Sequence, residues 1–185
     1  MPPEKQKAGF VGKPAGPEVC IMDAQGNKLD SGVDGEVCIR GDNVTNGYEN
    51  NEEANKTAFI NGWFRTGDQG HFDDEGYLKI SGRLKEIINR GGEKVSPLEV
   101  DNTLMEHKAV EQVVTFAVKD NLLGEAIGVA IVLKSGIDCN ETDIKNYARK
   151  HLADFKIPKY IRFLEEIPKG ATGKSVSYTH LRAHE

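Results

Sequence analysis

One aspartate stands where its carboxylate could bind a sugar. Asp68 ends the segment Trp-Phe-Arg-Thr-Gly-Asp at residues 63–68. A carboxylate beside a glycine turn can accept hydrogen bonds from two vicinal hydroxyl groups, as a ribose presents them. Gly-Asp is also a common turn pair, so taken alone the segment more often indicates a turn capped by Asp68, with Trp63 in the core.

Arg83 and two later glycines offer further binding groups. The guanidinium of Arg83 is a forked donor that suits a nucleotide sugar or phosphate, although taken alone the segment more often indicates a surface hairpin with solvated charges. Gly91 and Gly92, followed by Glu93, would let a backbone approach a ligand closely. They are equally consistent with a simple turn before a helix that starts at Ser96.

A lysine near the end of the chain lies in a glycine-rich segment. Residues 170–175, Gly-Ala-Thr-Gly-Lys-Ser, suggest a phosphate-binding loop. That motif needs a glycine where this chain has Pro168, and a long helix after the lysine, whereas only residues 175–185 follow Lys174. What remains is a lysine in a glycine-rich loop, which can neutralise charge that develops on a phosphoryl oxygen.

The first half of the chain alternates short apolar stretches with Gly, Asn and Asp turn signals, which predicts β-strands with tight connections. Strands are expected at residues 18–22 and 35–40, and a hairpin with an Asp-Glu-Gly turn at residues 72–80. Residues 52–59 are the exception and suit one short helix.

The second half begins with a helix that has several agreeing start signals. Ser96 can cap it, Pro97 fits its first position, and Glu99 can reach back to complete a capping box. The helical spacing places on one face Leu98, Asn102 and Met105, with Leu104 beside them.

Helix alternates with strand after Gly82, so the two halves differ in architecture. A second helix is expected at residues 141–152, and strands at residues 113–118, 127–133 and 160–164. The predicted fold class is α+β: a β-rich part over residues 1–82, then a small α+β domain over residues 83–174 with a three-stranded sheet and flanking helices.

Composition excludes several classes of protein. The 185 residues carry 24 Lys and Arg against 29 Asp and Glu, so the net charge is 24 − 29 = −5, which argues against non-specific nucleic-acid binding. No apolar run approaches the roughly 20 residues that cross a bilayer. Three widely spaced cysteines disfavour a disulfide framework and favour a reducing compartment, and the five histidines have no metal-ligand spacing.

The order and spacing of the motifs say more than any one of them. In sequence they are residues 47–48 (GY), 62–68 (GWFRTGD), 76–78 (GYL), 82–88 (GRLKEII), 91–100 (GGEKVSPLEV), 168–169 (PK) and 173–174 (GK). Together they resemble the AMP-binding, adenylate-forming acyl-CoA synthetase superfamily, which includes 4-coumarate–CoA ligases, fatty-acyl-CoA synthetases, firefly luciferase and peptide-synthetase adenylation domains. Residues 35–41 and 89–94 look most like the oxalate–CoA ligases of plants and fungi.

The resemblance implies a two-step reaction. A carboxylate attacks the α-phosphate of ATP to give an acyl-adenylate and pyrophosphate, and the thiol of coenzyme A then displaces AMP. By position, Asp68 would hold the ribose hydroxyls, Arg83 would support the same nucleotide, and Lys174 would be the catalytic lysine of adenylation. Mg²⁺ is implied by ATP, with no metal ligand expected in this chain.

The resemblance also implies a movement between the two steps. Lys85 would be the hinge about which the small domain turns. After the turn, Gly91, Gly92 and Glu93 would replace Lys174 at the site and line the tunnel for the pantetheine arm of coenzyme A.

The chain also departs from the family pattern. The phosphate loop and most of the acyl pocket are expected in a large N-terminal region that this chain lacks, so the isolated chain is expected to be inactive. Residues 175–185 break the pattern and are expected to be a non-native tail.

The expected function is that of the C-terminal portion of an ATP-dependent acid–CoA ligase inside the cell, in the cytoplasm or the peroxisome. Oxalate is the favoured acid, with a hydroxycinnamate or a fatty acid as the alternative. The expected partners are a small carboxylate, ATP and coenzyme A, without nucleic acid or a transmembrane segment. Two other classes remain open: a non-catalytic binding module, and an adenylation domain that loads a carrier protein.

Overall fold

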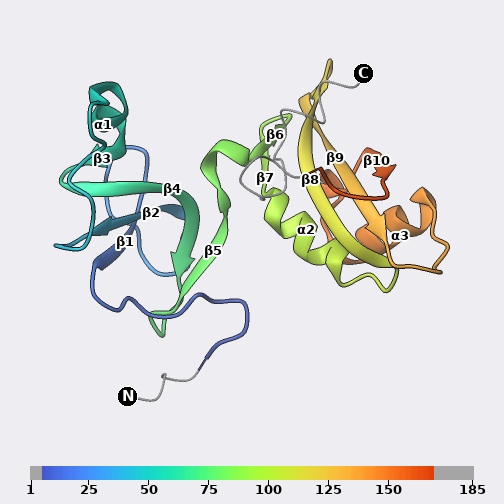
Figure 1. Cartoon of the computed structure of the whole chain (residues 1–185), viewed down its shortest axis with the longest axis horizontal. Helices are drawn as coiled ribbons and strands as arrows, with labels where there is room; N and C mark the ends of the chain where they lie inside the picture. Colours follow the sequence, from blue (N-terminus) through green and yellow to red (C-terminus); the bar gives the residue numbers. More distant parts are fainter. Residues whose placement is uncertain (1–5, 169–185) are drawn as a thin grey trace. The chain divides into compact units, whose positions relative to one another are not determined.

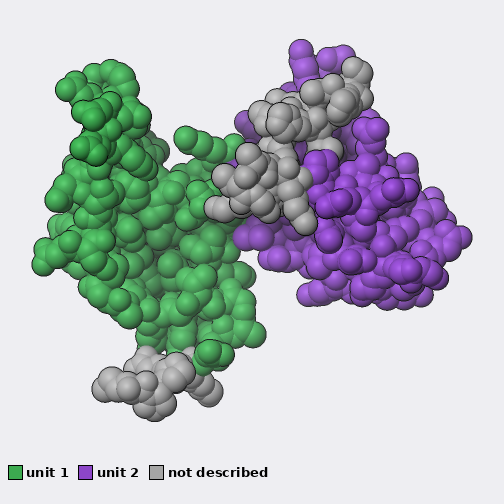
Figure 2. All heavy atoms as spheres, in the orientation of Figure 1, with its two compact units in different colours: residues 1–85 green, residues 86–185 purple. Residues whose placement is uncertain are grey.

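The computed structural model describes residues 6–168, and the chain divides into two compact units (Figure 1). Unit 1 is Met1–Lys85 and unit 2 is Glu86–Glu185, drawn in separate colours in Figure 2. The sequence placed this boundary at residue 82. Each unit has its own sheet and its own buried cluster, and each is described by itself.

Unit 1 is built on one antiparallel sheet of five strands. The order is β1 (Glu18–Met22), β2 (Gly35–Arg40), β4 (Trp63–Phe72) and β3 (Phe59–Ile60), and β5 (Leu78–Arg83) pairs with β4. The helix α1 (Glu52–Ala58) precedes β3, and the side chain of Asn51 caps it by accepting a hydrogen bond from the N–H of Ala54. The β-rich first half and its single short helix are confirmed.

The predicted hairpin forms between β4 and β5. Oδ1 of Asp73 accepts hydrogen bonds from the backbone N–H groups of Glu75 at 3.0 Å and Tyr77 at 2.8 Å. An aspartate that bonds the backbone in this way stabilises a tight turn. The two strands therefore continue in antiparallel register, with Phe72 opposite Leu78.

The buried cluster of unit 1 contains Cys20, Met22, Cys38 and Trp63. Cys20 and Cys38 lie opposite each other on β1 and β2, and both are free thiols. Burial raises the pKa of Cys38 to about 12, and burial also raises the pKa of Cys20. Both groups are therefore protonated at neutral pH and act as small apolar side chains rather than nucleophiles.

Unit 2 has a mixed sheet of five strands and two helices. The order is β10 (Tyr160–Phe163), β9 (Gly124–Leu133), β6 (Ile88–Arg90) and β7 (Glu93–Val95), with β8 (Val110–Asp120) paired to β9. β10 is parallel to β9 and the other pairs are antiparallel. The helices α2 (Pro97–Met105) and α3 (Glu141–His151) contribute to the same buried cluster as the strands. The predicted small α+β domain is confirmed.

The sheet of unit 2 has five strands where the sequence predicted three. The two additional strands, β6 and β7, are three residues each and pair across the turn of Gly91 and Gly92. Ile88 and Val95 face each other in this pair and are fully buried. Strands this short show no alternation of apolar and polar residues, so the sequence indicated only a turn.

Helix α2 begins where predicted, but without the predicted capping box. Ser96 is the N-cap residue and Pro97 lies in the first turn, yet the Ser96 side chain makes no capping hydrogen bond. The carboxylate of Glu99 is held elsewhere, since Nζ of Lys156 donates to both of its oxygens at 2.6 and 2.7 Å. The prediction of a capping box was therefore wrong.

The buried face of α2 also differs from the predicted one. Val100 and Leu104, four residues apart, are fully buried, whereas Leu98 and Met105 are 38% and 46% exposed. Side chains four residues apart lie above one another on a helix, so Val100 and Leu104 pack together against the sheet. The prediction was wrong because it placed Leu98 and Met105 in the core for their size and apolar character, whereas single large apolar side chains are often exposed on protein surfaces.

Asp101, also on α2, is a half-buried acid. Its Oδ1 atom and the hydroxyl oxygen of Thr115 in β8 are buried and have no hydrogen-bond partner within residues 6–168. Burial raises the pKa of Asp101 to about 6. Thr115 lowers the pKa of Asp101 in part, and the negative charge of Glu86 raises it further. The Thr115 hydroxyl itself makes no hydrogen bond with a described residue.

We expect the substitution Asp101→Asn to stabilise the chain at neutral pH. Because the folded-state pKa lies above the ordinary 3.8, the contribution of Asp101 to stability is fully present below pH 4 and is lost as the pH rises through 6. A pKa difference of about two corresponds to about 3 kcal/mol. Urea unfolding should show D101N more stable by about 1–3 kcal/mol at pH 7.5 and nearly unchanged at pH 4.

A suitable control for this measurement is Glu106→Gln. Glu106 follows the same helix and is exposed, so its charge is solvated in both the folded and unfolded states. E106Q should leave the free energy of unfolding almost unchanged at both pH values. A D101N gain of equal size at pH 4 and pH 7.5 would contradict the role of the buried charge.

Candidate functional site

Asp68 and Arg83 are neighbours on adjacent strands of unit 1. They are direct partners in the register of β4 and β5, and Nε of Arg83 lies 2.9 Å from Oδ1 of Asp68. The side chain of Asp68 is 28% exposed and that of Arg83 is 61% exposed, so a ligand can reach both. The pair presents a carboxylate acceptor beside a guanidinium donor.

Asp68 lies at the end of a bulge in β4. In the register of β2 and β4, the single residue Val37 faces three residues, 66–68. Gly67, at the centre of the bulge, has a φ of 74°, a left-handed conformation that favours glycine. Bulges redirect side chains and occur often beside functional sites. The Gly-Asp pair of the sequence is therefore a bulge within a strand, and Asp68 is its last residue.

Lys85 is the last residue of unit 1. It lies in a single 3-10 turn, η1 (Leu84–Glu86), and its side chain is exposed. A turn of this kind between two compact units is a place where changes in a few backbone dihedral angles can reorient one unit. The role of Lys85 as a hinge stays a prediction.

Gly91 and Gly92 form the turn of the β6–β7 hairpin in unit 2, with φ values of 63° and 96°. The N–H of Gly91 donates to the carbonyl oxygen of Leu123 at 2.8 Å, and the N–H of Gly92 donates to Oδ1 of Asn89 at 3.0 Å. A Cβ atom at Gly91 would lie only 3.0 Å from the Leu123 side chain. The turn is thus fixed in place, and the exposed Glu93 follows it at the start of β7.

The sequence analysis missed the residues that fix this turn. Besides binding Gly92, Asn89 donates its own N–H to Oε2 of Glu125 at 2.7 Å. An asparagine two residues before a glycine pair is a recognisable turn signal. Nothing in the sequence indicated Glu125, because it lies on β9, far along the chain.

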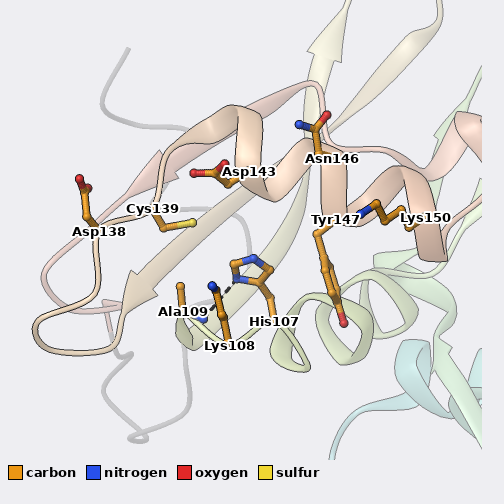
Figure 3. A pocket seen from close by; sticks show the side chains of 9 residues that line it. All are labelled: His107, Lys108, Ala109, Asp138, Cys139, Asp143, Asn146, Tyr147 and Lys150. Carbon is orange, nitrogen blue, oxygen red and sulfur yellow. Dashed lines mark hydrogen bonds between the residues drawn. The ribbon is translucent and has the colours of Figure 1, made fainter.

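Unit 2 also has a surface pocket that contains none of the predicted site residues (Figure 3). Its volume is about 360 Å³, and it is lined by His107, Lys108, Ala109, Asp138, Cys139, Asp143, Asn146, Tyr147 and Lys150. Nδ1 of His107 accepts a hydrogen bond from the N–H of Ala109 at 3.3 Å, drawn dashed in Figure 3, and the ring packs edge-on against Tyr147.

Burial lowers the pKa of His107, and the neighbouring Lys108 lowers it further. The imidazole is therefore neutral at pH 7, with its proton on Nε2 because Nδ1 accepts a bond. The charged side chains of the lining balance, with two lysines against two aspartates. This pocket offers no excess of either charge to select a ligand.

Comparisons with known proteins address the whole chain. Residues 99–174 match the family model of the AMP-binding enzyme C-terminal domain. The chain is 49% identical over 176 residues to oxalate–CoA ligase of Saccharomyces cerevisiae, and 51% identical over 168 residues to oxalate–CoA ligase of Arabidopsis thaliana. These alignments cover 94% and 91% of this chain. The chain belongs to the AMP-binding, adenylate-forming family.

A solved structure of the same family has the same fold. The o-succinylbenzoate CoA synthetase of Bacillus subtilis, in complex with the acyl-adenylate intermediate OSB-AMP, matches with a TM-score of 0.84 and 33% identity. The match covers 91% of this chain and 34% of that one. The chain likewise spans 32% and 33% of the two oxalate–CoA ligases, so it corresponds to about a third of these family members.

Three further sequence predictions concern Lys174, metals and membranes. Lys174 is the last residue that the family model matches, and it lies outside the described residues. Within residues 6–168, no group of three or more His, Cys, Asp or Glu side chains is arranged to hold a metal ion. No described helix of this AMP-binding family member is long and apolar enough to span a membrane.

Proposed function

We propose that this chain is part of an ATP-dependent acid–CoA ligase, which converts a carboxylate, ATP and coenzyme A into an acyl-CoA, AMP and pyrophosphate. The observation that carries the proposal is the contact between Asp68 and Arg83 at the β4 bulge. It occurs in a chain that is about half identical to two oxalate–CoA ligases.

In this proposal Asp68 and Arg83 bind the nucleotide. Oδ1 of Asp68 is paired with Arg83, and Oδ2 makes no hydrogen bond with the described residues, so the carboxylate has acceptor sites available for the two ribose hydroxyls. The exposed guanidinium of Arg83 pairs with Asp68 and has donors left for the ribose or a phosphate. Lys174 then stabilises the charge on the α-phosphate during attack by the acid.

The second step uses the other unit. A rotation at Lys85 brings the turn of Gly91 and Gly92 to the site, where its backbone lines the path of the pantetheine arm. The contacts of this turn with Leu123 and Asn89 make it a preformed surface rather than a loop that must order itself. Coenzyme A binding would therefore cost little conformational entropy at this turn.

ATP enters such reactions as its Mg²⁺ complex, in which the metal neutralises phosphate charge. The described residues form no metal-binding group, so the proposal assigns no step on this chain to the metal. The residues of this chain bind the ribose, the phosphate and the pantetheine arm.

Oxalate is the proposed acid, because two of the relatives at about 50% identity are oxalate–CoA ligases. A hydroxycinnamate or a fatty acid is the alternative. The acid-binding pocket distinguishes them, since a small basic pocket suits oxalate and a deep apolar one suits the others. The proposed location is inside the cell, in the cytoplasm or the peroxisome.

A chimera tests the proposal. Residues 9–174 of this chain would replace the aligned residues of the Saccharomyces cerevisiae oxalate–CoA ligase. The chimera is expected to form AMP and oxalyl-CoA from oxalate, ATP and coenzyme A, whereas neither the remaining part of the yeast protein nor the isolated chain should turn over. A chimera that is folded by circular dichroism but forms no AMP would refute the proposed function.

A further inference from the structure

Glu36 is a buried acid that the proposed function does not use. It is the second residue of β2, and only 8% of its side chain is exposed. A carboxylate at such a position is tolerated only when its charge is paired and its oxygens are hydrogen-bonded. The partners of its two oxygens therefore indicate what Glu36 holds in place.

Both partners belong to the segment of β4 that carries Asp68. Oε2 of Glu36 accepts from Nε of Arg65 at 2.7 Å and lies 2.6 Å from Nη2 of the same side chain. Oε1 accepts from the backbone N–H of Gly67 at 3.1 Å. Arg65 immediately precedes the bulge and Gly67 is its centre, so one carboxylate joins the start of the bulge to its middle.

A second contact fixes the end of the bulge. Oγ1 of Thr66 donates to the carbonyl oxygen of Val37 at 2.8 Å and accepts from the N–H of Asp68 at 3.1 Å. The backbone of Asp68 is thus held through Thr66, and the residue between them, Gly67, is held by Glu36. Without these bonds, nothing in this part of the sheet would stabilise two additional residues of β4 opposite Val37.

We propose that Glu36 is a positioning residue for nucleotide binding: its carboxylate fixes the β4 bulge that presents Asp68 to the ribose beside Arg83. This inference rests on the proposed role of Asp68. Glu36 does not touch the nucleotide, and it acts only by setting the direction of Asp68. A misplacement of about 1 Å in such a group is enough to weaken binding by an order of magnitude or more.

The test is Glu36→Gln in the chimera. Glutamine keeps the shape, but it loses the ion pair and turns an amide N–H₂ group toward either Arg65 or the N–H of Gly67, which are both donors. The KM for ATP should rise about tenfold, while the KM values for oxalate and coenzyme A stay within about twofold. An unchanged KM for ATP in a folded E36Q chimera would overturn the inference.

The matched control is Glu18→Gln. Glu18 makes the same kind of forked pair, with Arg40 across β1 and β2 of the same sheet, and both of its oxygens lie 2.9 Å from Nη2 of Arg40. Its side chain is 61% exposed, and its contacts do not reach the bulge. E18Q should leave the KM for ATP unchanged. An equal rise in E18Q and E36Q would show a general effect of the sheet and would overturn the inference.

A double variant shows whether Glu36 acts through Asp68. If it does, Glu36→Gln should have little further effect on the KM for ATP once Asp68 is alanine. Additive losses in the double variant would contradict positioning. If E36Q does not fold, Glu36→Asp serves instead: it keeps the buried charge but is one methylene shorter, so it cannot reach both Arg65 and Gly67. A positioning role predicts a raised KM for ATP in E36D, whereas a role of charge alone predicts the wild-type value.

One measurement separates the failure of this inference from the failure of the proposed function. In the ¹⁵N-labelled chain, hydrogen exchange of the Gly67 N–H reports its bond to Glu36 without any substrate. E36Q should speed that exchange about tenfold or more, and E18Q should not. Unchanged exchange overturns the inference alone, whereas an Asp68→Ala chimera with unchanged KM for ATP overturns the proposed role of Asp68.

Discussion

Replacing Lys174 with alanine in the chimera is expected to slow acyl-adenylate formation by about 10²–10³-fold, the range seen when one charge-stabilising group is removed from a reacting centre. The ammonium group would otherwise neutralise charge on the α-phosphate and on the attacking carboxylate. ATP–pyrophosphate exchange with oxalate measures this half-reaction. Formation of the thioester from a preformed acyl-adenylate should be largely spared, because in the proposed function Gly91, Gly92 and Glu93 would serve that step in its place.

Two further variants complete this experiment. Lys174→Arg keeps the positive charge in a larger, forked group and should recover part of the exchange rate. Lys150→Ala removes an exposed lysine from α3 and should leave both half-reactions unchanged. Exchange at the wild-type rate in K174A would refute the role of Lys174. An equal loss in both half-reactions would show that the residue supports folding rather than adenylation.

The sequence predicted the elements that are long enough to show a clear pattern of apolar and charged residues. The strand β8 contains the apolar stretch of residues 113–118, β9 has a buried run, and α3 has acidic residues in its first turn and basic residues in its last. Short or partly exposed elements were missed or misjudged. β6 and β7 exist because Ile88 and Val95 enter the core, and the buried face of α2 depends on what β8 presents to it; a local pattern contains neither fact.

The candidate site shows the same limit at the level of single residues. The sequence singled out Asp68 and Arg83 separately, but their contact depends on strand register, which a bulge shifts in β4 and a second irregularity shifts between β4 and β5. Resemblance to a family supplied the roles of both residues. It did not supply Glu36, whose bond to Gly67 crosses 31 positions of sequence and appears only when β2 and β4 pair.

Asp68→Ala should raise the KM for ATP of the chimera about 10²-fold with a smaller change in kcat. A carboxylate that accepts hydrogen bonds from two ribose hydroxyls contributes about 1.5–3 kcal/mol for each. In the proposed function these bonds would be present before and after the chemical step, so their loss should weaken nucleotide binding rather than transition-state stabilisation. The fold should survive, because an accessible ion pair such as Asp68–Arg83 contributes at most about 1 kcal/mol to stability.

The decisive comparison uses 2′-deoxy-ATP and 3′-deoxy-ATP. The wild-type chimera should prefer ATP over either analogue by about tenfold or more, since each lacks one hydroxyl that Asp68 would bind. D68A should lose most of that preference, because the removed hydroxyl no longer has its acceptor. Asp68→Asn, which keeps the shape but not the charge, should fall between the two. If D68A discriminates between ATP and its deoxy analogues as strongly as the wild type does, then Asp68 does not bind the ribose, and its pairing with Arg83 has another purpose.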